Sequence, residues 1–270
     1  MLEMRNISFA YDKGASVLSN LQLQIHEGEC IALCGRNGSG KTTITRLLMG
    51  LEKPQQGSIY YKGKNITTWS PAERSRIIGY VFQNPERQMF RPTVREEVAY
   101  GVKQLHLTEE EQQTRVAEAL RETGLFEVAE AYPLNLNRSE KQRVAIASAL
   151  AMKTKFVVLD EPTSGQDRAS TKRLMELLQK VHQQGITVVL ITHDMDVIAE
   201  YCQRVIALGA GGIRFDGTPE ALFTTCEELY SLGLRRPACV RLSLAVPAVG
   251  YCRTMREFTA KMSQYIGGNV

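Results

Sequence analysis

The segment that decides the fold class is Gly35-Arg36-Asn37-Gly38-Ser39-Gly40-Lys41-Thr42, which matches the phosphate-loop pattern G-x-x-x-x-G-K-[ST] in full. Residues 30–34 before it form a short apolar run typical of a buried parallel strand, and residues 43–49 after it have helical spacing. The glycines let backbone N–H groups turn toward an anion, and a helix N-terminus adds partial positive charge. We therefore expect this loop to bind nucleotide phosphates, with Lys41 at the β- and γ-phosphates and the Thr42 hydroxyl on Mg²⁺.

Length and composition are those of an ordinary soluble globular protein. The 270 residues suffice for one large domain or a domain with a small appendage, and 43% of them are hydrophobic. The net charge of +4 and the lack of a dense Lys/Arg tract predict no direct nucleic-acid partner. No apolar run reaches membrane-spanning length, and the first residues do not begin a signal peptide. We expect a cytosolic protein with six free, buried cysteines, in which any membrane role goes through a partner.

Two carboxylates follow a second apolar strand. Residues 156–159 are continuously apolar and run directly into Asp160 and Glu161. An Asp-Glu pair after a strand is commonplace alone, but it is more specific downstream of a phosphate loop. One carboxylate can hold Mg²⁺ beside the loop threonine, and the other can orient or deprotonate an attacking water.

Three other residues have site-like positions at strand ends. His193 follows the apolar strand 187–192, at the edge where ligands of open α/β sheets bind. Gln83 follows the short strand 77–82 and is either a plain loop residue or a site residue. Tyr11 closes the first strand, where it could pack at an edge or stack on a base, and its spacing favours neither.

The remaining pattern predicts an α/β fold with an inserted helical block. The N-terminal strands, including the alternating segment 21–26, predict an antiparallel β layer beside a mostly parallel sheet. Helices are expected over 94 to about 131, and the capping boxes Thr108-x-x-Glu111 and Ser139-x-x-Gln142 mark two helix starts. We therefore expect a helical subdomain at about 84–152 and a small C-terminal tail.

Together these motifs resemble the ATP-binding cassette (ABC) ATPases over residues 1 to about 220. The resemblance implies an ATP sandwiched between two subunits, which close on it and drive an integral membrane partner. It implies that Tyr11 stacks on adenine, which decides between the two roles left open above. It also implies that the segment Ser164-Gly165-Gln166-Asp167 crosses to the partner subunit, with Gln166 at a position where an apolar residue is usual. The remaining roles that it implies are ATP contact by Thr43, Mg²⁺ or water contact by Gln83, magnesium association by Asp160, general-base catalysis by Glu161 and γ-phosphate contact by His193.

Two further segments are similar to the ATPases of energy-coupling factor importers, which take up vitamins and cobalt or nickel. One is the extended segment 82–90 after Gln83, and the other is the tail from Leu229, which includes Leu232-Gly233-Leu234 and Pro237. The similarity implies an ATPase domain over 1–220 and a small region over 221–270 that helps two ATPases pair. It also implies a location at the cytoplasmic face of the membrane, held there by partner subunits.

One motif departs from the family. The signature Leu-Ser-Gly-Gly-Gln is replaced by Leu136-Asn137-Arg138-Ser139-Glu140, which puts side chains in place of glycine and a negative charge near a polyanion. In the family the signature contacts the γ-phosphate held by the other subunit, so a site built on this segment should be slow or only bind ATP. We therefore expect a heterodimer with one strong and one weak site, although sequence drift in an adaptable loop is an alternative.

Two rival functions fit the same motifs. One is a soluble ABC-type ATPase that uses nucleotide-dependent association in repair, translation or regulation. Such chains often carry coiled coils, tandem cassettes or basic arms, and none is visible in this sequence. The other is a cassette that clamps ATP without hydrolysing it.

Overall fold

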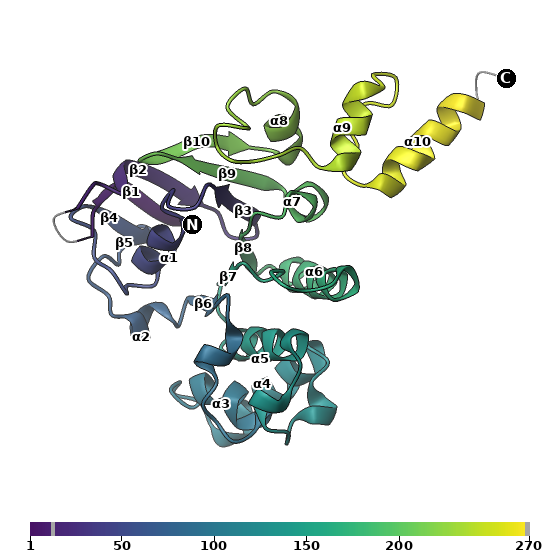
Figure 1. Cartoon of the computed structure of the whole chain (residues 1–270). Helices are drawn as coiled ribbons and strands as arrows, with labels where there is room; N and C mark the ends of the chain where they lie inside the picture. Colours follow the sequence, from purple (N-terminus) through teal and green to yellow (C-terminus); the bar gives the residue numbers. More distant parts are fainter. Residues whose placement is uncertain (12–13, 268–270) are drawn as a thin grey trace.

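Two β-sheets form the framework of the computed structural model, which describes residues 1–11 and 14–267 (Figure 1). Positions 12–13 and 268–270, the latter within the predicted C-terminal region, lie outside the described residues. The smaller sheet is antiparallel, in the order β2-β1-β4-β5. Its strands are β1 (Leu2–Phe9), β2 (Leu18–Ile25), β4 (Gln56–Tyr61) and β5 (Lys64–Asn65).

The larger sheet has six strands in the order β10-β9-β3-β8-β7-β6, and only β10 runs antiparallel to its neighbour. Both faces are buried, as expected for a parallel sheet covered by other elements. Side chains therefore alternate between two cores: Cys30 and Ala32 of β3 face one, and Ile31 and Leu33 face the other. The strands are β3 (Cys30–Gly35), β6 (Ile78–Val81), β7 (Phe156–Asp160), β8 (Thr187–Ile191), β9 (Arg204–Gly209) and β10 (Gly212–Gly217).

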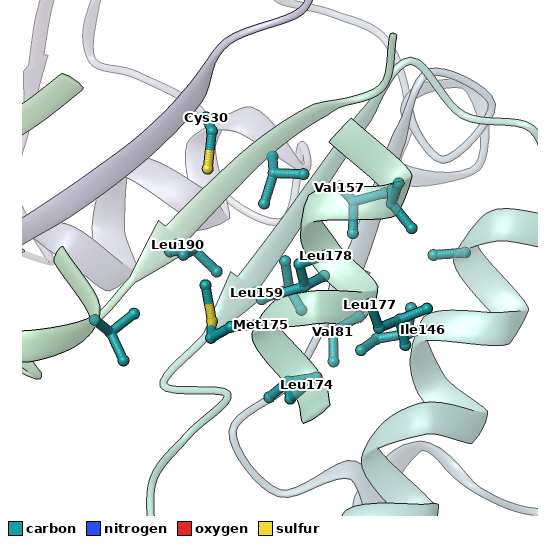
Figure 2. Close-up of a cluster of buried hydrophobic side chains, with 14 of the residues drawn as sticks. Cys30, Val81, Ile146, Val157, Leu159, Leu174, Met175, Leu177, Leu178 and Leu190 are labelled. Atoms are coloured by element: carbon teal, nitrogen blue, oxygen red, sulfur yellow. The ribbon is translucent and has the colours of Figure 1, made fainter. Parts of the chain in front are cut away.

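Helices cover the larger sheet on one side. Figure 2 shows strand residues such as Val157, Leu159 and Leu190 packed against α6 (Arg168–Gln183), with Ile146 of α5 (Arg138–Ala151) beside them. The other helices on this side are α7 (Met195–Tyr201) and α8 (Pro219–Thr224). On the opposite side α1 (Lys41–Leu48) lies between the two sheets, with Ile44 and Leu47 fully buried. The predicted α/β fold with an antiparallel layer is confirmed.

A helical subdomain follows β6, as predicted, and forms the lower lobe of Figure 1. It contains a 3₁₀ turn, η1 (Pro85–Gln88), and the helices α3 (Val94–Val102), α4 (Glu109–Glu122) and α5. The predicted start of α4 is confirmed, because the Thr108 side chain accepts from Glu111 N–H while Glu111 accepts from Thr108 N–H at 2.8 Å.

The predicted capping box at Ser139 and Gln142 is wrong. Helix α5 begins at Arg138, and its N-cap is Asn137, whose Oδ1 accepts from Glu140 N–H at 3.0 Å. Glu140 in turn accepts from Asn137 N–H at 3.0 Å. The Asn-x-x-Glu spacing offers the same reciprocal bonds two residues earlier with a charged acceptor, while Gln142 is buried and unable to reach back.

The C-terminal region starts against the core and then extends away from it. Leu222 and Phe223 of α8 are fully buried in the same core as the large sheet. Helices α9 (Ala238–Ala245) and α10 (Met255–Gly267) project from the rest of the molecule in Figure 1. Over the described residues, no helix combines the length and the apolar composition needed to cross a bilayer. All six cysteines are free, and Cys226 is half-buried rather than buried as expected.

A fully buried arginine fastens the C-terminal end of α1. Arg74, in the short helix α2 (Pro71–Arg74), is 0% exposed and donates to backbone carbonyl oxygens alone. Its Nη1 donates to the carbonyls of Leu47 and Leu48, and its Nη2 donates to those of Ile66 and Thr67 at 2.8 and 2.9 Å. The first two belong to the last turn of α1, where a cation also complements the helix dipole. Although burial lowers the pKa of Arg74, a guanidinium stays protonated.

Replacing Arg74 by leucine should therefore destabilise the protein. The Arg74→Leu change removes charge-assisted bonds to several buried carbonyls, for which we expect a loss of about 3 kcal/mol or more in the free energy of unfolding. Urea unfolding followed by circular dichroism measures it. Arg76→Leu, which removes the same charge from an exposed position nearby, is the control and should change little. Equal stability of the two variants would show that Arg74 does not hold α1.

Candidate functional site

The strand order brings the predicted site residues to one edge of the large sheet. The phosphate loop, which we define as Gly35–Thr42, follows β3. Its neighbour β8 leads to His193, the next strand β7 ends in Asp160 with Glu161 after it, and β6 leads to Gln83. Because these four strands are parallel, their carboxyl ends lie together, which is where open α/β sheets bind ligands.

The phosphate loop begins at a glycine that no other residue could replace without strain. Gly35 has a φ of 137°, and a Cβ atom on it would lie 2.4 Å from the carbonyl oxygen of Leu208 in the neighbouring strand. A Cβ atom does not approach another heavy atom so closely, and this neighbour is a backbone atom, so it cannot swing aside. The close approach of β3 to β9 therefore sets the direction in which the loop leaves the sheet.

Lys41 lies across the inside of this loop. Its ammonium donates to the carbonyl oxygens of Gly35 at 2.8 Å and Arg36 at 3.0 Å. Burial lowers the pKa of Lys41, while the negative charges of Glu161 and Asp160 act in the opposite direction. The N-terminus of α1 has no acidic residue in its first turn and no side-chain cap, so its N–H groups and the ammonium can serve an external anion.

The Asp160 carboxylate is held from the neighbouring strand. The Tyr80 hydroxyl on β6 donates to Oδ2 of Asp160 at 3.1 Å, and burial raises the pKa of Asp160 above its usual value. A nearby cation would offset that burial. The oxygen atoms offered by Thr42, Gln83 and Asp160 are the hard donors that Mg²⁺ prefers, so the residues present fit a magnesium ion.

Glu161 and His193 form a direct pair. Oε2 of Glu161 lies 2.8 Å from Nδ1 of His193, and Glu161 is largely buried whereas 73% of the His193 side chain is exposed. Glu161 also has a φ of 46°, a left-handed conformation that costs a non-glycine residue about 1–2 kcal/mol. Its N–H donates to the Ile191 carbonyl at 2.8 Å, which holds this conformation in place. Such strain clusters at functional sites.

Tyr11 packs beside the start of α1. Its ring meets Phe9 edge to face at 4.8 Å between centroids, and its hydroxyl lies 3.2 Å from Oγ1 of Thr43. The residue nevertheless stays 39% exposed. The structure therefore contains the edge packing considered above and leaves part of the ring available for a base.

Gln83 is an exposed residue, two positions after β6 ends at Val81. The strand is one residue shorter at each end than predicted, so Phe82 is outside it and 44% exposed. Phe82 meets Tyr80 edge to face at 4.7 Å, and Phe90 meets Tyr100 in the same way at 4.8 Å. The exposed aromatic residues Phe82, Phe90 and Tyr100 thus lie on both sides of Gln83 in the sequence.

The altered signature segment is part of a helix start. The side chains of Asn137 and Glu140 bond to each other's backbone, so both already serve the cap of α5. Arg138 instead lies against Gly165, because a Cβ atom on Gly165 would be 3.1 Å from its Nη1. Asn137, Arg138, Ser139 and Gly165 line a cavity of about 680 Å³.

The predicted dimer-crossing residue Asp167 also has a local role. It is the N-cap of α6, and its carboxylate accepts from Ser170 N–H at 2.7 Å. That bond lowers the pKa of Asp167. The preceding Gln166, at a position where an apolar residue is usual, donates to the Pro162 carbonyl at 2.8 Å.

Sequence reasoning missed two supports of the site. Tyr80 and the Phe9 ring were predicted only as strand residues, and nothing in their local patterns distinguishes them. The role of Tyr80 follows from pairing across strands: β6 lies beside β7, and Tyr80 is in register with Val158, two residues before Asp160. Phe9 instead ends β1 and contacts Tyr11, two residues further along the chain.

Comparison with known proteins places the chain in a family. A family model described as "ABC transporter" matches residues 18–164. A Methanosarcina mazei protein, provisionally named an ABC transporter ATP-binding protein, is 41% identical over 93% of this chain, which spans only 42% of that protein's length. The energy-coupling factor transporter ATP-binding protein EcfA of Methanothermobacter thermautotrophicus is 36% identical over the whole chain and 88% of its own length.

Two solved structures with similar folds indicate the same family. The chain superposes on cbiO1 from Clostridium perfringens, described as part of the ABC transporter complex cbiONQ, with a TM-score of 0.78 at 31% identity, covering 92% of this chain and 96% of the other. It also matches the dimeric ATP-binding cassette MJ0796 bound to ADP and Pi, with a TM-score of 0.72 at 30% identity over 81% and 99% of the two chains. The chain therefore belongs to the ABC transporter family, and its fold is that of the family's ATP-binding cassette.

Proposed function

We propose that this chain binds and hydrolyses ATP to energise a membrane importer of the energy-coupling factor type, for a vitamin or a transition metal. The observation that carries the proposal is one sheet edge that holds both an anion cradle and a carboxylate–imidazole pair. The cradle consists of Lys41 and the uncapped start of α1, and the pair is Glu161 with His193. The similarity to EcfA over the whole chain supports the importer type.

In this proposal the phosphate loop holds the β- and γ-phosphates through its N–H groups and Lys41, while Thr43 and the Tyr11 ring lie toward the nucleoside. Glu161 takes the proton of a water whose oxygen attacks the γ-phosphorus, and the bond from that phosphorus to the ADP oxygen breaks. His193 is bonded to Glu161 through Nδ1, which leaves Nε2 for a γ-phosphate oxygen. Mg²⁺ bound by Thr42, Gln83 and Asp160 would neutralise charge on the phosphates.

Two substitutions separate binding from hydrolysis. Lys41→Ala removes the ammonium from the cradle and should weaken Mg-ATP binding about tenfold or more. Glu161→Gln should leave binding intact and lower turnover by about 10²–10⁴-fold, because an amide cannot accept the proton. Calorimetric titration with ATP and a phosphate-release assay measure the two quantities. Unchanged ATP affinity in Lys41→Ala would remove the loop from the site, and substantial turnover in Glu161→Gln would remove Glu161 as base.

We propose that the partner in the ATP sandwich is a second ATPase with an intact signature. Glu140 brings an acceptor-only, negatively charged carboxylate to the start of α5, and Arg138 and Ser139 carry side chains where the family signature has glycine. The region 221–270 is our candidate for pairing, because Leu242 of α9 and Tyr265 and Ile266 of α10 are exposed apolar side chains. A heterodimer would retain one full site on this chain's own loop.

Turnover by the purified chain alone tests the heterodimer. We expect it to be about 100-fold below that of a variant that restores the family signature, Asn137→Ser, Arg138→Gly, Ser139→Gly and Glu140→Gln, since each lost oxyanion donor costs about that much. Serine and glutamine keep a capping box, so the start of α5 is retained. Equal and brisk turnover by both proteins would instead favour sequence drift and a homodimer.

We further propose that the integral membrane partner docks beside Gln83, which would place the chain at the cytoplasmic face of the membrane. Phe90 is 61% exposed, and the Arg91 guanidinium lies 4.5 Å from the centre of the Tyr100 ring beside it. Aromatic and arginine side chains of this kind dominate many interfaces.

Capture from detergent-solubilised membranes tests the docking site. Phe90→Ala should reduce co-purification of the membrane subunits about tenfold or more without lowering ATP binding. The matched control is Phe126→Ala, because Phe126 is also exposed, has the Arg121 guanidinium 4.7 Å from its ring centre and lies in another part of the subdomain. Recovery of nucleic acid instead of membrane subunits would favour the non-transport ATPase.

A further inference from the structure

A turn in the C-terminal region returns to the phosphate loop. The turn comprises Glu228–Gly233, between α8 and α9 in Figure 1, and we call it the tail turn. It ends as helices commonly do: Leu234 N–H donates to Leu229 O at 3.1 Å and Gly233 N–H donates to Tyr230 O at 3.0 Å, with Gly233 left-handed at φ 73°. Leu229 and Leu232 are buried in the main core, which fixes the turn in place.

The tail turn touches the phosphate loop at Gly233. A Cβ atom on Gly233 would lie 2.5 Å from Cγ of Arg36, 3.4 Å from its Cδ and 3.6 Å from its Cβ. Cγ is close to the backbone and cannot move away as the tip of a long side chain can. Beside this contact the tail turn and the outer side of the loop, Arg36–Ser39, line a cavity of about 580 Å³.

Arg36 is also the residue whose backbone organises the loop. Its carbonyl oxygen accepts from the Lys41 ammonium at 3.0 Å and from Ser39 N–H at 3.1 Å. A displacement of Arg36 would therefore move both the lysine and the turn that carries the loop's N–H groups. The tail turn itself belongs to none of the ATP-binding motifs identified in the sequence.

We infer that Gly233 is a positioning residue for ATP binding: by lacking a side chain it lets the tail turn support Arg36 and so sets the conformation of the phosphate loop. This inference rests on the proposed role of that loop. By linkage, whatever shifts the tail turn changes the affinity for ATP, and ATP binding changes the tail turn reciprocally.

Gly233→Ala tests the contact, with Gly250→Ala as matched control. Both glycines are left-handed, at φ 73° and 68°, but a Cβ on Gly250 would have no atom within 4 Å. Both variants bear the same backbone cost, whereas only Gly233→Ala pushes on Arg36. We expect Gly233→Ala to raise the Kd for Mg-ATP about tenfold over Gly250→Ala, measured by titration calorimetry on the full chain in the Glu161→Gln background.

Rescue separates positioning from a general structural defect. In an Arg36→Ala background the new Cβ would face only Cβ of residue 36, at an ordinary 3.6 Å. Adding Gly233→Ala to Arg36→Ala should therefore change the Kd less than about twofold. The same tenfold loss in both backgrounds, or equal Kd values for Gly233→Ala and Gly250→Ala, would overturn the inference.

A third variant covers the case in which Gly233→Ala does not fold. Leu232→Ala, which loosens the tail turn without backbone strain, should raise the Kd for Mg-ATP several-fold, and an unchanged Kd would count against the inference.

Lys41→Ala, measured in parallel, separates failure of the proposed ATP-binding role of the loop from failure of the inference about Gly233. If Lys41→Ala leaves the Kd unchanged, the proposed role of the loop fails. If it weakens binding while the Gly233 and Leu232 variants do not, only the inference fails.

Discussion

The anchoring of helix α1 between the two sheets is the constraint on which the site depends. Ile44 and Leu47 bury its apolar face, and Arg74 bonds the carbonyls of its last turn. At the other end, the close contact of Gly35 with β9 directs the chain into the phosphate loop. A loop held at both ends presents its N–H groups with little further loss of conformational entropy, which is what a strong anion site requires.

The parallel sheet turns separate motifs into one site. Loops that follow β3, β8, β7 and β6 leave the same edge, so the lysine, the imidazole and the two carboxylates come together although they are distant in sequence. Local geometry then refines them: Tyr80 orients Asp160, and the left-handed conformation of Glu161 brings its carboxylate to His193. The strain at Glu161 is offset by the surrounding β ladder, as is typical of a preorganised site.

The segment that replaces the family signature makes its contacts within this chain. Asn137 and Glu140 complete a capping box that satisfies the N–H groups at the start of α5, and Arg138 packs on Gly165 in the same chain. Each of these contacts gives the segment a structural role within the chain. A carboxylate has no hydrogen to donate to a phosphate held by a second subunit and repels its negative charge, which is the physical basis for proposing an asymmetric pair of ATP sites.

The sequence by itself determined the phosphate loop, the strand that ends in Asp160 and Glu161, the inserted helices and the capping box at Thr108, because each depends on residues close together in the chain. Only the tertiary structure decided the Glu161–His193 pair, the Tyr80–Asp160 bond, the Arg74 carbonyl cluster and the contact of Gly233 with Arg36. Those contacts depend on strand order and on side chains brought together by packing, about which local periodicity carries no information. The cap of α5 was mispredicted because two overlapping patterns fit its start, and burial of Gln142 selected between them.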